Sequence, residues 1–106
     1  MPKDLRTFLA AYEKEHPEDV IRVEKEIDSA YECTAIARHF ETLNKFPLII
    51  FYDILTASRE KSAFPCAINV LGDRRKLAYA IGSTFENVAI EWRRRADECR
   101  IKPVVV

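Results

Sequence analysis

Residues 72–76, "GDRRK", are the part of this 106-residue chain best suited to chemistry. Apolar residues precede Gly72, and a helix is expected to begin after Asp73. Its first turn would carry Arg74, Arg75 and Lys76, although cations are disfavoured beside the positive end of a helix dipole. Backbone N–H groups and these cations could together hold a phosphate. The alternative is that the cations serve the structure or contact another piece of protein.

The structural alternative is favoured because the motifs that cradle phosphates are absent. The chain has only two glycines, Gly72 and Gly82, so it contains neither GxGxxG nor GxxxxGK[ST]. Side chains of one helical turn also point in several directions, so the three cations cannot all reach one ligand.

The remaining polar residues suggest no active site. Glu86 and Glu91 diverge around a predicted helix, which makes them a poor acid–base pair. Cys33 and His39 fall on different helical faces, which removes a Cys–His dyad. The run Arg93 to Arg95 is surrounded by acidic residues, typical of an exposed, ion-paired face in which Glu91 pairs with Arg95. The sequence shows no metal-ligand cluster.

Composition narrows the class of protein. Seventeen basic and seventeen acidic residues give no net charge, which argues against a general nucleic-acid binder. Three cysteines without a CxxC pair indicate reduced thiols in a cytoplasmic protein rather than a disulfide framework. Their apolar contexts predict that Cys33, Cys66 and Cys99 are buried and unreactive. Neither a signal-peptide core nor a run approaching the ~20 apolar residues of a membrane span is present.

Hydrophobic periodicity predicts an α/β (α+β) fold, a small mixed sheet with about four helices. The expected order is helix, strand, helix, strand, strand, helix, helix. Asp4 caps the first helix, which Pro17 ends. The next elements are a strand over 20–27, a helix from Ser29 with Leu43 near its end, strands within 46–55 and 64–71, a helix over 74–81, and a last helix from Ser83 that stops before Pro103.

Capping and apolar patterns give finer expectations. Ser29 with Glu32, and Ser83 with Glu86, form predicted capping boxes. Gly82 is expected to end its helix in the left-handed conformation. Two apolar stripes should be buried, one on each of two helices: Cys33, Ile36, Ala37, Phe40 and Leu43, then Phe85, Val88, Ala89, Trp92, Ala96 and Cys99.

Four segments, in order, resemble the N-terminal region of UbiD-type decarboxylases. They are "DLRTFLAAYEKE", "VIRVEKEIDSAYECTAIARHF", "FPLIIFYDI" and "INVLGDRRKLAYAIG". The positions that match the family pattern are Glu26, Ile27, Asp28, Glu32, Ala35 and Ile36, the strand 49–54, and Asn69, Gly72, Arg75, Ala78, Ala80 and Gly82. Ser29 stands where the family usually has proline, and "FYDILTAS" lacks the family's Asn and Gly.

The resemblance implies a parent enzyme that reversibly decarboxylates aromatic or α,β-unsaturated carboxylic acids without oxidation. Such enzymes use prenylated FMN with Mn²⁺ and K⁺. The family's metal-binding and catalytic residues lie downstream of this region, so none is assigned within residues 1–106. The resemblance also favours Arg75, at a recurrent arginine of the family, for a structural ion pair, and it makes Arg74, Arg75 and Lys76 candidate interdomain or anion contacts.

The resemblance further predicts the domain layout. Residues 1–102 would form the N-terminal domain, and residues 103–106 would begin a linker or strand toward a cofactor domain that this chain lacks. The valines at the terminus could instead dock on their own domain. The expected function is that of a catalytically silent N-terminal domain or fragment, whose partners are the rest of a homo-oligomeric enzyme. The alternatives are a free-standing anion-binding or protein-interaction module, or the small subunit of a multi-chain decarboxylase.

Overall fold

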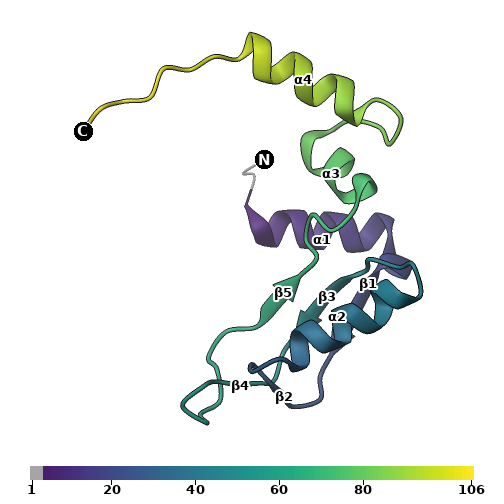
Figure 1. Cartoon of the computed structure of the whole chain (residues 1–106), viewed down its shortest axis with the longest axis vertical. Coiled ribbons are helices and arrows are strands. Elements are labelled where there is room, and N and C mark those ends of the chain that lie inside the picture. Colours follow the sequence, from purple (N-terminus) through teal and green to yellow (C-terminus); the bar gives the residue numbers. More distant parts are fainter. Residues whose placement is uncertain (1–3) are drawn as a thin grey trace. The chain divides into compact units, whose positions relative to one another are not determined.

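The computed structural model describes residues 4–106 (Figure 1). Within this range it has an α+β fold, and the predicted order of helices and strands is confirmed. The elements are α1 (Leu5–Glu15), the 3-10 helix η1 (Pro17–Asp19), β1 (Val20–Val23), β2 (Ile27–Asp28), α2 (Glu32–Thr42), β3 (Leu48–Phe51), β4 (Ile54–Leu55), β5 (Cys66–Ile68), α3 (Arg74–Ile81) and α4 (Val88–Glu98).

The strands form a mixed three-stranded sheet and a separate two-stranded ladder. The sheet has the order β1-β3-β5, with β1 parallel and β5 antiparallel to β3, while β2 pairs with β4 in parallel. The predicted strand over 20–27 is therefore two short strands, and the apolar run over 46–55 also divides. Each of these two segments first forms a strand of the three-stranded sheet, then passes through a short polar stretch, and then forms a strand of the two-stranded ladder.

The core lies where α2 covers one face of the sheet. Its buried residues are Ile27, Ile49, Phe51 and Ile54. The β1–β3 register places Ile21 beside Ile49 and Val23 beside Phe51, so the apolar face predicted for β1 is confirmed. The α2 stripe of Cys33, Ile36, Ala37 and Phe40 packs against the same cluster, as predicted.

Leu43 does not extend that stripe into the core. It is 54% exposed and follows the last residue of α2, Thr42. The chain turns here, because Asn44 has a φ of 55° and its N–H donates back to the Glu41 carbonyl at 2.9 Å. The helical periodicity therefore ends before it can bury Leu43.

The predicted caps have different outcomes. Asp4 caps α1, because its Oδ1 accepts from the Thr7 N–H at 2.7 Å. The box between Ser29 and Glu32 is wrong: α2 begins at Glu32, whose Oε2 accepts instead from the Asp28 N–H at 2.8 Å. Asp28 belongs to β2, so the chain must first leave the ladder before it can enter the helix.

The chain divides into two compact units, one ending at Asp73 and the other beginning at Arg74. The first holds both ladders with α1 and α2. The second consists of α3, α4 and a C-terminal segment, 99–106, without helix or strand (Figure 1). Val104 to Val106 are exposed. The boundary between residues 102 and 103 stays a prediction.

Candidate functional site: the α3–α4 hairpin

The basic first turn of α3 begins with Arg74, which binds the loop that precedes α4. Its Nε donates to the Phe85 carbonyl at 2.7 Å, and its terminal nitrogen donates to the Glu86 carbonyl at 3.1 Å. The guanidinium also lies 5.1 Å from the centre of the Phe85 ring. Arg74 therefore stabilises the interhelical loop, since a guanidinium with two carbonyl acceptors and a ring contact is already well satisfied.

The three cations of this turn do not share one surface. Arg74 is exposed, Arg75 is half-buried, and Lys76 is fully buried. Neither Arg75 nor Lys76 is an unpartnered charge. Lys76 is therefore no surface cation of this chain, and the arrangement gives no single cradle in which all three could hold a phosphate.

The loop between the helices begins as the sequence predicts and then departs from it. Gly82 has a φ of +70°, and the Ser83 N–H donates to the Ala78 carbonyl at 2.8 Å, which closes the end of α3. The capping box between Ser83 and Glu86 is wrong, because α4 begins at Val88. The hydroxyl of Thr84 is the group that accepts in this turn, from the Asn87 N–H at 3.2 Å.

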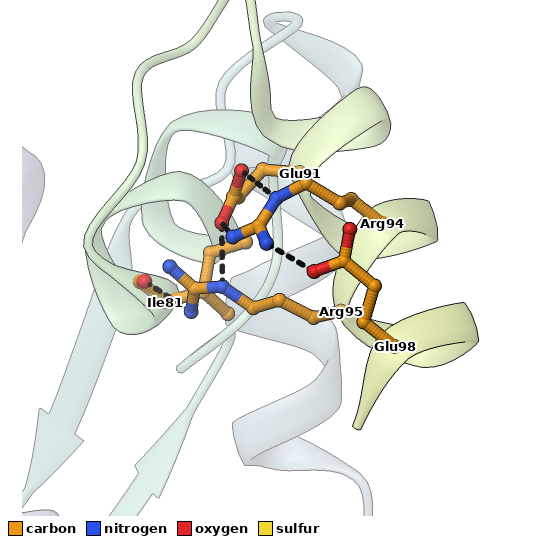
Figure 2. Close-up of polar contacts among 5 residues, drawn as sticks. All are labelled: Ile81, Glu91, Arg94, Arg95 and Glu98. Atoms are coloured by element: carbon orange, nitrogen blue, oxygen red, sulfur yellow. Dashed lines mark hydrogen bonds and ion pairs between the residues drawn. The ribbon is translucent and has the colours of Figure 1, made fainter. Parts of the chain in front are cut away.

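An ion-pair network covers one side of α4 (Figure 2). Glu91 accepts from Arg95 Nε at 2.7 Å and from a terminal nitrogen of Arg94 at 2.6 Å. Arg94 also reaches Glu98 at 2.5 Å. The predicted pair of Glu91 with Arg95 is confirmed. Spacings of three and four residues would also have revealed the contacts of Arg94.

Arg95 additionally joins the two helices. Its terminal nitrogen donates to the Ile81 carbonyl at 2.7 Å (Figure 2). The last carbonyls of a helix lack partners within that helix, so Arg95 satisfies one of them at the end of α3. Arg74 on α3 and Arg95 on α4 thus each bind backbone near the other helix, and together they fix the hairpin. Sequence spacing carried no signal for either carbonyl contact.

Electrostatics exclude Glu91 as a proton donor at neutral pH. Hydrogen bonds from Arg94 and Arg95 lower the pKa of Glu91 to about 2. The same contact with Glu91, together with the nearby Glu98 carboxylate, raises the pKa of Arg94. Both groups keep their charges across the physiological range, as a structural network requires. That Glu86 and Glu91 form no acid–base pair stays a prediction.

The apolar stripe predicted for α4 is largely uncovered. Val88 is buried, but Phe85 is 54% exposed and Trp92 is 57% exposed. The smaller members of the stripe, Ala89, Ala96 and Cys99, are exposed as well. Val88 is the one buried member of the stripe, although Trp92 lies one turn further along the same side of α4. Helical spacing alone therefore does not account for the difference in exposure.

The cysteines differ from the prediction in part. Cys33 and Cys66 are half-buried in the core, whereas Cys99 is exposed because it lies just beyond the end of α4. Among residues 4–106, no three His, Cys, Asp or Glu side chains are grouped as a metal site would require. No helix of this range combines the length and the hydropathy that crossing a membrane demands.

Comparison with known proteins adds one finding. The family model of the 3-octaprenyl-4-hydroxybenzoate carboxy-lyase N-terminal domain, UbiD_N, matches residues 12–96. This range includes all the strands, α3, most of α4 and the residues of the two arginine contacts. No curated protein and no solved structure matches the chain significantly.

Proposed function

The chain belongs to the UbiD family of carboxy-lyases, whose N-terminal domain it carries, and we propose that it is the non-catalytic N-terminal part of a decarboxylase. The parent would decarboxylate aromatic or α,β-unsaturated carboxylic acids reversibly and without oxidation. The observation that carries this proposal is the family match over residues 12–96, which spans most of the chain. The task of this part would be to pack beside the cofactor domain and help shape the cleft between them.

The hairpin supports a packing role. Phe85 and Trp92 are large apolar side chains that are each more than half exposed. Exposed clusters of large apolar residues mark surfaces that bind other protein. The arginine contacts at Ile81 and at the loop before α4 hold this surface in one shape, which lowers the entropy lost on docking.

The cofactor and metal of the parent are assigned to the rest of the enzyme. Prenylated FMN would supply the electron-accepting chemistry of decarboxylation when bound there. The residues described here do not fit a Mn²⁺ site, because among residues 4–106 no three His, Cys, Asp or Glu side chains are grouped closely enough to hold a metal ion. Glu91 and Glu98 of α4 both accept hydrogen bonds from Arg94. We therefore assign no catalytic step to this chain. We also propose that the parent enzyme is a homo-oligomer and that it works in the cytoplasm.

A small subunit beside a separate catalytic chain is the nearest competing function, because the same exposed face would then contact another polypeptide. A free-standing anion-binding module receives less support. Its best cation, Arg74, is bound to two carbonyls, and Lys76 is buried.

The first experiment measures the intact mass of the native protein together with the coding frame beyond Val106. A mass several times 12.3 kDa, with a frame that continues into further family motifs, supports the N-terminal part of one enzyme. A native mass near 12.3 kDa with an immediate stop contradicts that proposal and leaves the subunit alternative. Co-purification with a catalytic chain would then distinguish a subunit from a free module.

A second experiment tests catalytic silence. The 106-residue chain is titrated with prenylated FMN and assayed for release of CO₂ from aromatic and α,β-unsaturated acids. We expect neither a spectral change of the flavin nor turnover. Binding or turnover by this chain would contradict the silent role.

A further inference from the structure

Two thiols lie on the same face of the sheet, in the part of the core that α2 covers. Cys66 is the first residue of β5 and pairs in register with Phe51 of β3. Directly opposed residues of neighbouring strands direct their side chains to the same face. Phe51 is fully buried in the core cluster, so Cys66 shares that face.

Cys33 reaches the same cluster from the other layer. It is the second residue of α2, and it packs against the core with Ile36, Ala37 and Phe40. Burial raises the pKa of the Cys33 thiol, and a charge on Cys66 would raise this pKa further. Cys33 and Cys66 therefore pack against one core cluster from the two sides of the boundary between helix and sheet.

Neither Cys33 nor Cys66 takes part in a disulfide in the described structure. Both cysteines are free thiols, and neither residue is fully buried. The third thiol, Cys99, lies at the end of α4 in the other compact unit. Because Cys99 is exposed, it is replaced by serine in the test below.

We propose that Cys33 and Cys66 form a redox-responsive pair that closes into a disulfide between α2 and β5. With glutathione disulfide as oxidant, one protein thiolate attacks it, forms a mixed disulfide and releases one glutathione thiolate. The second protein thiolate attacks the protein sulfur of that mixed disulfide and releases the second glutathione. Two protein thiols are thereby oxidised, and one glutathione disulfide is reduced to two glutathiones.

The consequence is a covalent tie across the core. The segment between the two cysteines contains most of α2 together with β3 and β4. Closing so long a loop restricts the unfolded chain and thereby favours the folded state. Oxidation would therefore raise the melting temperature of the unit that holds both ladders, and reduction would return it to its original value.

The test uses the full chain with Cys99→Ser, incubated with glutathione disulfide and analysed under non-reducing conditions. We expect a mass lower by two hydrogen atoms and a trypsin digest in which peptide 26–38 is linked to peptide 62–74. We also expect a higher melting temperature that dithiothreitol reverses. Circular dichroism of the reduced variant confirms that it is folded before oxidation.

The matched controls are the double variants Cys33→Ser with Cys99→Ser and Cys66→Ser with Cys99→Ser. Each should gain one glutathione and show no reversible rise in melting temperature. Three results would overturn the proposal: glutathione adducts on both thiols without a link, links only between molecules, or no reaction of the folded Cys99→Ser protein.

Discussion

The guanidinium of Arg95 binds the carbonyl of Ile81 at 2.7 Å, fourteen residues earlier in the chain. This contact joins the last turn of α4 to the last residue of α3. Arg74 makes the complementary connection, from the first turn of α3 to the carbonyls of Phe85 and Glu86. Arg74 and Arg95 therefore both bind main-chain carbonyls, and both stabilise the hairpin of α3 and α4.

Replacing Arg95 by methionine tests the link between the helices. Methionine keeps much of the apolar stem but leaves the Ile81 carbonyl and Glu91 without this donor. We expect the chain to lose about 1 kcal/mol of unfolding free energy, as for a lost hydrogen bond. Urea denaturation followed by Trp92 fluorescence measures the change. The matched control is Arg93→Met, which removes only an exposed pair with Asp97 and should change stability by less than about 0.5 kcal/mol.

The network around Glu91 predicts a dependence of stability on acid. The pKa of Glu91 is about 2 in the folded chain, below its ordinary value of 4.5. A lowered folded pKa stabilises the protein above the ordinary value, and this contribution is lost as the pH falls toward 2. Comparing the wild type with Glu91→Gln should therefore show the larger difference in unfolding free energy at neutral pH.

The two proteins should converge as the pH is lowered from about 5 to about 2, because protonation removes from Glu91 the charge that glutamine lacks. A difference that stays constant across this range would contradict the assigned role of the carboxylate. High salt should also reduce the difference at neutral pH, since the network is exposed.

Substitutions of Gly82 test the conformation of the turn between α3 and α4. Its φ of +70° disfavours any residue with a Cβ, although no atom lies within 4 Å of the space that a Cβ would occupy. Gly82→Ala should therefore cost about 1 kcal/mol through backbone strain alone. Gly82→Asn should cost less, because asparagine tolerates the left-handed conformation. Chemical denaturation of both variants measures this order, and equal losses would indicate a steric cause.

Two substitutions that shorten a side chain to alanine test which residues belong to the core. Phe51 is fully buried between α2 and the sheet, so Phe51→Ala should cost roughly 3–5 kcal/mol and can unfold the chain. Leu43 is 54% exposed, and Leu43→Ala should change stability by less than about 0.5 kcal/mol. Circular dichroism and thermal unfolding distinguish the two. A large loss from Leu43→Ala would place its side chain in the core.

Sequence patterns were most informative where a single element decides the outcome. Helical spacing correctly indicated the partly buried face with which α2 packs against the core, namely Cys33, Ile36, Ala37 and Phe40. Asp4 and Gly82 were assigned correctly because an N-cap and a left-handed C-terminal residue depend on local backbone alone. The family match over residues 12–96 likewise confirms the resemblance carried by the four ordered segments.

Tertiary structure decided what local patterns could not. Ser29 could not begin a helix because Asp28 is held in a ladder with β4, a strand that lies far along the chain. Helical spacing predicted that Trp92 would be buried, but spacing gives only the direction of a side chain and not whether a neighbour covers it. The contacts of Arg74 and Arg95 with main-chain carbonyls also required the folded hairpin, because every residue offers the same carbonyl and only the fold selects one.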